Sequence, residues 1–261
     1  MKYYVVDAFA DKPFQGNPAA VCVLDKWLDD ELLLNIAAEN NLSETAYVVR
    51  ESDKGADYHL RWFTPAREVD LCGHATLATS YVLNNFVEPI KSSVKFRTQS
   101  GILEIRVKDG LYEMDFPSRM PKQIPVTDQL AEALGVTPRE AHIARDLVVL
   151  VDSDEQIRKL NPNLFLLNAV PDYLVCAVTA PGDDCDFVSR TFAPKVNVPE
   201  DPVCGSAHCS LIPYWAKRLG KTEMLARQRG RRGGTIYCKD EGERVRIAGR
   251  AALYAEGILH I

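Results

Sequence analysis

Strand-like patterns outnumber helix-like patterns along this chain. Two hairpins are expected, at residues 102–116 and 235–247. The first turns at Asp109-Gly110, a strong short-range hairpin signal, and the second turns around residues 240–243. Runs rich in β-branched and aromatic residues predict further strands at residues 3–9, 19–24, 45–50, 58–63, 94–97 and 187–192.

Amphipathic patterns predict helices at residues 29–39 and 128–134, and two further helix-like segments cover residues 73–84 and 205–219. Pro213 lies inside the last of these and is expected to bend or interrupt it. The strands occur mostly as consecutive hairpins rather than as strict strand–helix–strand units. The pattern therefore predicts an α+β fold and not a doubly wound parallel sheet.

A pair of motifs occurs twice, about half the chain apart. The first copy reads RWFTP at residues 61–65 and CGHA at 72–75; the second reads RTFAP at 190–194 and CGSA at 204–207. In both copies the motifs follow a predicted strand and open a predicted helix. Such a shared order indicates internal duplication.

A linker is expected near the middle of the chain. Three prolines, at positions 117, 121 and 125, interrupt any regular pattern there. The expected halves are residues 1–117 and 118–261, with the final strand free to return to the first half.

The composition narrows the function classes. The 261 residues are 46% hydrophobic, enough for one large or two modest cores. The net charge of -5 has the wrong sign for a sequence-independent nucleic-acid binder, so no nucleic acid is expected as a partner. The arginine-rich segment at residues 227–234 is interpreted as a solvated loop or as a source of one arginine for a substrate carboxylate.

Neither a membrane partner nor an exported location is expected. No apolar run approaches the roughly 18 residues that a membrane span needs. The opening residues lack the sections of a secretory signal. The sequence predicts a cytoplasmic protein.

The seven cysteines are interpreted as reduced thiols, because they are odd in number and scattered through apolar segments. The spacing of Cys204 and Cys209 fits no common zinc pattern, so no metal is expected. The first strand is not followed by a glycine-rich dinucleotide motif, and the chain has no Walker A sequence. The residues therefore indicate no nucleotide cofactor.

The repeated motifs carry the candidate chemistry. A helix start presents unpaired N–H groups and the positive end of the helix dipole, which together bind anions. Gly73, Gly205 and Ser206 are candidate carboxylate anchors. The same field is expected to lower the pKa of Cys72 and Cys204.

Two duplicated halves would set these helix starts opposite each other across a cleft. A small carboxylate-bearing substrate held there would gain stabilisation as a proton leaves the neighbouring carbon. Proton abstraction at carbon is therefore the chemistry that this arrangement favours.

Four segments resemble the PhzF-like proteins of phenazine biosynthesis, within the wider diaminopimelate-epimerase-like fold. They read FQGNPAAV at 14–21, NNLSETAYV at 40–48, DLCGHAT at 70–76 and EDPVCGSAHC at 200–209. The resemblance implies two pseudo-symmetric halves, each a curved, barrel-like, mostly antiparallel sheet around a central helix. It also implies a substrate between the halves, no organic cofactor and a homodimer.

The resemblance further implies a proton-shift isomerase in which Glu44 moves the proton. His74, Asp201 and Ser206 match the other polar positions of the family site, and Asn17 matches a substrate-binding position. If Glu44 acts near neutral pH, burial is expected to raise its pKa.

Two other hypotheses stay open. Racemases and epimerases of the wider fold use one cysteine at each helix start, so Cys72 and Cys204 are a second candidate acid/base pair. Their motifs here read CGHA and CGSA instead of the racemase patterns CGNG and CGSG, and both cysteines also fit a role as small buried residues. A non-catalytic small-molecule binder with the same fold is the third hypothesis.

Overall fold

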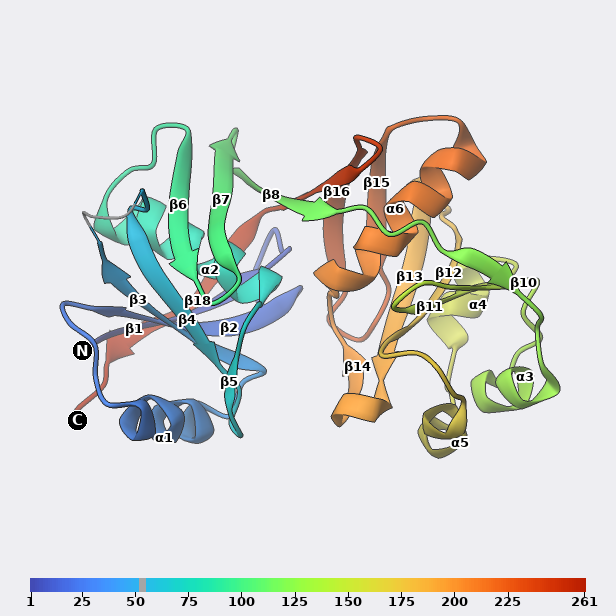
Figure 1. Cartoon of the computed structure of the whole chain (residues 1–261), viewed down its shortest axis with the longest axis horizontal. Helices are drawn as coiled ribbons and strands as arrows, with labels where there is room; N and C mark the ends of the chain where they lie inside the picture. The colour runs from blue at the N-terminus through green and yellow to red at the C-terminus, as the bar shows by residue number, and fades with distance from the viewer. Residues whose placement is uncertain (52–54) are drawn as a thin grey trace. The chain divides into compact units, whose positions relative to one another are not determined.

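A computed structural model describes residues 1–51 and 55–261. The chain forms two compact units. Unit 1 comprises Met1–Asp115 together with Ala248–Ile261, and unit 2 comprises Phe116–Ile247. Each unit combines a mostly antiparallel sheet with a few helices (Figure 1), which confirms the predicted α+β class.

Unit 1 is built around a sheet with two parallel crossovers. Strand β1 pairs antiparallel with β18 and β2; β3 runs parallel to β2, and β4 runs antiparallel to β3. Strand β4 then pairs with β5 and runs parallel to β6, which continues antiparallel into β7 and β8. The strands are β1 (Lys2–Ala8), β2 (Asn17–Leu24), β3 (Glu44–Arg50), β4 (Tyr58–Phe63), β5 (Glu68–Val69), β6 (Ser93–Thr98), β7 (Gly101–Lys108), β8 (Leu111–Pro117) and β18 (Ala251–Ile258).

The helices of unit 1 lie in its two crossovers. Helix α1 (Asp30–Asn40) joins β2 to β3, and α2 (Gly73–Val82) leads through a π-helical turn, Leu83–Val87, to β6. The predicted Asp109-Gly110 turn is confirmed, since Lys108 pairs with Leu111 and both turn residues have positive φ. Positive φ at both central residues is what a tight two-residue hairpin requires.

Unit 2 repeats the same order of pairings. Strands β10 and β11 are antiparallel, β12 runs parallel to β11, and β13 runs antiparallel to β12. Strand β13 pairs with β14 and runs parallel to β15, which pairs with β16. The strands are β9 (Lys122–Ile124), β10 (Glu140–Ile143), β11 (Leu147–Leu150), β12 (Cys176–Pro181), β13 (Phe187–Ala193), β14 (Val198–Asp201), β15 (Glu223–Gln228), β16 (Gly234–Asp240) and β17 (Arg244–Gly249).

Four α-helices belong to unit 2: α3 (Asp128–Leu134), α4 (Asp154–Lys159), α5 (Leu164–Ala169) and α6 (Gly205–Leu219). Helix α6 occupies the position in unit 2 that α2 occupies in unit 1, between the hairpin strand and the next parallel strand. This shared pairing order supports the internal duplication that the repeated motifs predict.

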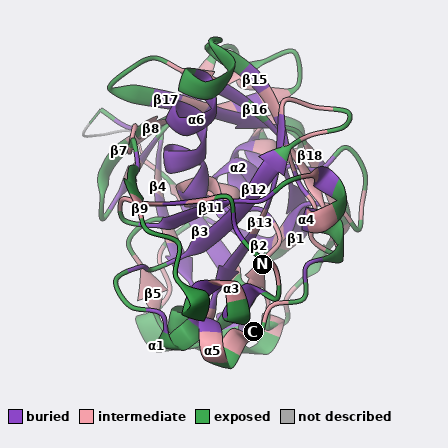
Figure 2. Cartoon of the chain, turned by 90° about the vertical axis from the view of Figure 1, so that its right-hand side faces the viewer, coloured by how far each residue is buried: buried purple, intermediate pink, exposed green. Residues whose placement is uncertain are grey.

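The helix that follows each repeated motif is the buried centre of its unit. Seven of the ten residues of α2 are buried, and α6 is buried from Ala207 to Ala216 (Figure 2). In unit 2, Trp215 of α6 stacks on Phe187 of β13, with ring centroids 5.5 Å apart. A helix surrounded by apolar contacts holds its first turn in a fixed position.

The predicted interruption at Pro213 is wrong, because α6 runs through it as one helix. Proline cannot donate to the carbonyl four residues earlier, which belongs to Cys209. The backbone N–H of Arg119 donates to that carbonyl instead, at 2.9 Å. The expected linker at residues 117–125 is likewise not wholly irregular, since it contains β9, which pairs with β10.

The repeated R-x-F motif holds the loop that leads into each central helix. In unit 1, Arg61 forms a two-pronged ion pair with Glu68, both contacts being 2.7 Å. The Arg61 guanidinium also lies 5.0 Å from the centroid of the Phe63 ring. Glu68 stands four residues before Cys72.

Unit 2 repeats this arrangement. Arg190 pairs with Glu200 through two contacts of 2.7 Å and lies 5.2 Å from the Phe192 ring. Glu200 again stands four residues before the cysteine, Cys204. The two forks fix the hairpins that present the helix starts, and planar two-pronged pairs of this kind fix geometry as well as charge.

Replacing Glu200 with alanine should destabilise the protein by about 1.5–3 kcal/mol, because Arg190 is mostly buried and would lose its charged partner. Urea unfolding measures the change. The control is Glu155→Ala, which removes an exposed, water-screened pair with Lys159 and should change the free energy of unfolding much less. Equal losses for the two variants would contradict a structural role for the fork.

Candidate active site

Three predicted site residues come together in unit 1. Glu44 opens β3, Cys72 caps the start of α2 and His74 is the second residue of that helix. His74 Nε2 lies 3.1 Å from Glu44 Oε2, and Cys72 Sγ lies 3.6 Å from His74 Nδ1. The Glu44 and His74 side chains are 19% and 10% exposed, so the pair is largely shielded from water.

The register of the sheet places Asn17 on the same face as Glu44. Ala19 of β2 lies opposite Glu44 of the parallel strand β3. Side chains two residues apart on one strand share a face, so Asn17 lies on the Glu44 face at the same end of the sheet. Asn17 is only 1% exposed.

The side chain of Cys72 does not cap the first turn of α2. Cys72 has an extended backbone, and its carbonyl accepts the N–H and the hydroxyl of Thr76. The N–H groups at the helix start, including that of Gly73, therefore remain candidate anion ligands.

Glu44 and His74 form a carboxylate–imidazolium pair. Burial alone raises the pKa of Glu44, but the His74 charge and the contacts with His74 and Cys72 outweigh it, so the pKa is lower than usual. Burial alone lowers the pKa of His74, but Cys72 and Glu44 together raise it well above its ordinary value. The expected rise for Glu44 is wrong, because His74 supplies a neighbouring positive charge.

The atoms of this pair are close but not well aligned for a hydrogen bond. Their attraction is therefore mainly that of opposite charges at short range in a poorly solvated place. Chemically, the pair offers a carboxylate base beside a cationic acid.

The expected low cysteine pKa values are also wrong. Burial, with the charge of Glu44, raises the pKa of the Cys72 thiol, and burial together with Asp201 raises that of Cys204 well above its ordinary value. The helix field does not outweigh the loss of water around either sulfur. Burial therefore favours the thiol form over the thiolate at both cysteines.

Unit 2 holds the remaining predicted residues around the start of α6. Cys204 caps that helix, and its Sγ lies 3.3 Å from Ser206 Oγ. Asp201 Oδ1 accepts the N–H of Val203 at 3.1 Å, so its side chain shapes the loop before the helix. A Cβ atom added to Gly205 would meet no neighbouring heavy atom within 4 Å, so the space beside this glycine is open.

Sequence reasoning missed Gln228, a 1% exposed residue that fixes this loop. Its Oε1 accepts the N–H of Cys204 at 3.0 Å, and its Nε2 donates to the Asp201 carbonyl. Gln228 lies within the arginine-rich segment, where the sequence pattern indicates charged residues and not a buried amide. Two of those arginines, Arg227 and Arg229, pair with acidic residues of unit 2 and are structural.

The two units are not equivalent in chemistry. In unit 1 the motif residue Phe63 pairs with Thr45, and in unit 2 the matching Phe192 pairs with Cys176. The residue before each partner is Glu44 in unit 1 and Val175 in unit 2, so Val175 is the counterpart of Glu44. Ser206 is the counterpart of His74, since each stands two residues after the cysteine. The acid–base pair therefore exists in unit 1 and has no copy at the matching positions of unit 2.

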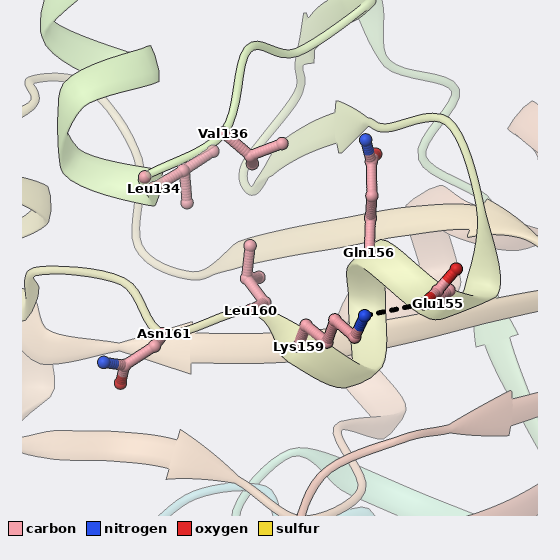
Figure 3. Close-up of a pocket in the computed structure, with 8 residues that line it drawn as sticks. Leu134, Val136, Glu155, Gln156, Lys159, Leu160 and Asn161 are labelled. Atoms are coloured by element: carbon pink, nitrogen blue, oxygen red, sulfur yellow. Dashed lines mark hydrogen bonds and ion pairs between the residues drawn. The ribbon is translucent and has the colours of Figure 1, made fainter.

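A pocket of about 450 Å³ lies elsewhere in unit 2 (Figure 3). Apolar side chains from the end of α3 and from Leu160 line it, and Lys159 pairs with Glu155 at its edge. None of the predicted site residues lines this pocket. Its only close charged pair is exposed, so the pocket offers no buried acid or base for proton chemistry.

Within residues 1–51 and 55–261, no helix is long and apolar enough to cross a membrane. In the same part of the chain, Glu44, Cys72 and His74 form a group whose ligand atoms all lie within 4.8 Å of one another. A metal ion would find nitrogen, sulfur and oxygen ligands there.

The architecture is an α+β fold with an internal repeat. A predicted epimerase from Pseudomonas aeruginosa has the same fold, with a TM-score of 0.74 and 19% identity over 99% of this chain and 98% of that one. A family profile described as phenazine biosynthesis-like protein matches residues 6–257. The chain belongs to this family.

Similar proteins agree with that assignment. An uncharacterized isomerase from Pseudomonas aeruginosa is 53% identical over 99% of this chain and 98% of its own length. A PhzF-family crystal structure from Enterococcus faecalis has a TM-score of 0.96 and 48% identity, over 100% of this chain and 99% of that one. The protein is therefore a member of an isomerase family.

The pKa values of His74 and His208 should be shifted in opposite directions from the ordinary imidazole value. His74 should keep its proton above the ordinary pKa of 6.5, because Cys72 and Glu44 favour the cation despite burial. His208 should stay neutral down to about 4, because burial disfavours its charge. NMR titration of the ring carbons measures both values.

The variant Glu44→Gln tests whether the Glu44 carboxylate raises the pKa of His74. Without the carboxylate, the pKa of His74 should fall while that of His208 stays the same. An unchanged His74 titration in this variant would contradict the ion pair.

The pair should also make stability depend on pH. The lowered pKa of Glu44 stabilises the folded protein at pH values above 4.5, the ordinary pKa of a glutamate. The raised pKa of His74 stabilises the folded protein at pH values below 6.5, the ordinary pKa of a histidine. A double-mutant cycle with Glu44→Gln and His74→Asn should give the largest coupling energy between these values. The coupling should decline as the pH rises through the folded-state pKa of His74 and as it falls through that of Glu44; a flat profile would contradict this.

Proposed function

We propose that this protein is a cofactor-independent isomerase that shifts a proton on a small carboxylate-bearing substrate. Glu44 removes and returns the proton, and His74 is its cationic partner. The observation that carries the proposal is the buried contact of 3.1 Å between these two side chains at the start of α2. Membership of the phenazine biosynthesis-like family supports it.

The proposed step begins with Glu44 as the base. Its lowered pKa keeps the carboxylate ionised at neutral pH, ready to accept a proton from carbon. As the C–H bond breaks, its electron pair moves into the unsaturated system of the substrate. The His74 cation and the N–H groups at the start of α2 stabilise the negative charge that develops.

The step ends when protonated Glu44 returns the proton to a different carbon. Substrate and product then have the same atoms and the same charge, so no cofactor has to accept electrons. Asn17 and Gly73 are proposed to bind the substrate; the sheet register, in which Asn17 shares a face with Glu44, supports the proposal for Asn17. For unit 2, Asp201 as a further catalytic group, and Gly205 and Ser206 as substrate ligands, remain predictions from the resemblance.

The two-cysteine racemase is the alternative. It is supported by the position of a cysteine at each central helix start. The raised pKa values of Cys72 and Cys204 count against it, because a thiol is a poor base. The absence of a Glu44 counterpart at Val175 also favours chemistry from one unit over a symmetric pair.

Transfer of deuterium from solvent tests the proposal. The wild-type protein in D2O should label at least one acid in a panel of small unsaturated and hydroxylated carboxylates. Glu44→Gln should lower the rate of labelling and of product formation about 10²–10⁴-fold, the usual contribution of a general acid–base. Cys204→Ser should label at a rate close to that of the wild type.

The opposite pattern, with Glu44→Gln active and Cys204→Ser inactive, would establish the racemase mechanism instead. Failure of the wild-type protein to label any acid, while it still binds one, would point to the non-catalytic binder.

A further inference from the structure

The cluster of Glu44, Cys72 and His74 has a second property that proton transfer does not use. It offers one carboxylate oxygen, one sulfur and one imidazole nitrogen, all within 4.8 Å of one another. Cys72 and His74 stand at the fixed start of a buried helix, and Glu44 opens the strand beside it. Three protein ligands of these types with a fourth position open are typical of reactive zinc sites.

The spacing is close to what zinc needs. Zinc bonds of about 2.0–2.3 Å in a tetrahedron place neighbouring ligand atoms about 3.3–3.8 Å apart. Glu44 Oε2 lies 3.1 Å from His74 Nε2, whereas Cys72 Sγ lies 3.6 Å from the other ring nitrogen, Nδ1. A zinc ion uses only one of these nitrogens, and a set of one ligand atom from each residue lies within 4.8 Å. Rotation of the His74 ring and a closure of about 1 Å would bring that set to the spacing that zinc needs.

We propose that Glu44, Cys72 and His74 bind one zinc ion, and that this ion inhibits the enzyme reversibly. Binding a cation here displaces the thiol proton of Cys72 and the extra ring proton of His74 into the solvent. No redox step is involved. The ion then occupies the electron pairs through which Glu44 and His74 act, so the inhibition, though not the binding, rests on the proposed function.

Unit 2 contains a built-in control for this site. Cys204 takes the same place at the start of α6 as Cys72 does at the start of α2. Its neighbours at the matching positions are Val175 and Ser206, neither of which is a good zinc ligand. The second cysteine therefore has the helix start but lacks the ligand set.

Cobalt(II) is the probe, because a thiolate bound to cobalt gives an intense near-ultraviolet charge-transfer band. Cobalt(II) titrated into the metal-free, untagged full chain should give this band with one ion per chain, and zinc should abolish it by displacement. The band should be lost in Cys72→Ser and kept in Cys204→Ser. No band in the wild type, or a band that survives Cys72→Ser, would overturn the proposal.

A second variant guards against loss of folding. Glu44→Gln keeps the thiol and should retain the band, with an affinity at least about tenfold weaker, because an amide is a poorer ligand than a carboxylate. Circular dichroism checks that each variant is folded. Unchanged affinity in Glu44→Gln would remove Glu44 from the site. Since cobalt binding is measured without turnover, these results stand apart from the deuterium experiment.

Discussion

The contact between Glu44 and His74 is the interaction on which the chemistry of this protein depends. Two opposite charges lie 3.1 Å apart with little access to water. A buried pair of this kind adds little net stability, because removing both charges from water costs about as much as their attraction returns. Strongly perturbed pKa values of paired groups are instead typical of functional sites.

The rest of unit 1 holds this contact in place. Helix α2 is buried from Ala75 to Ser80, so the position of its first turn is set by the core. The hairpin before that turn is held by the fork of Arg61 and Glu68. Glu44 lies at the start of strand β3, in the sheet beside the helix. The fold thus brings residues from two separate segments, β3 and α2, together as one acid–base pair.

The internal repeat duplicates this support without duplicating the chemistry. Both units contain the arginine–glutamate fork, the cysteine at the helix start and the same order of strand pairing. Val175 and Ser206 replace the carboxylate and the imidazole in unit 2. His208 of that unit instead contacts the Cys204 carbonyl through Nδ1 at 2.8 Å, as Thr76 does for Cys72 in unit 1.

Much of this could be predicted from the sequence, because local patterns determine it. The Asp109-Gly110 hairpin, the α6 helix and the two motif copies follow from short-range signals, and the resemblance singled out Glu44 and His74. The pKa directions could not be predicted, since they depend on which charge lies beside which buried group. The Cys209 carbonyl that Pro213 leaves without a helix donor is paired with Arg119, which is far away in the chain. The role of Gln228 could not be predicted, because only the fold shows that this residue is buried. The role of Glu200 could have been predicted, since a glutamate stands four residues before each motif cysteine.

Neutron diffraction from a crystal of the free protein in D2O at neutral pH tests the central claim most directly, since it locates each deuteron. The account predicts deuterons on both ring nitrogens of His74 and none on the Glu44 carboxylate. A deuterated Glu44 beside a His74 with a single ring deuteron would contradict it.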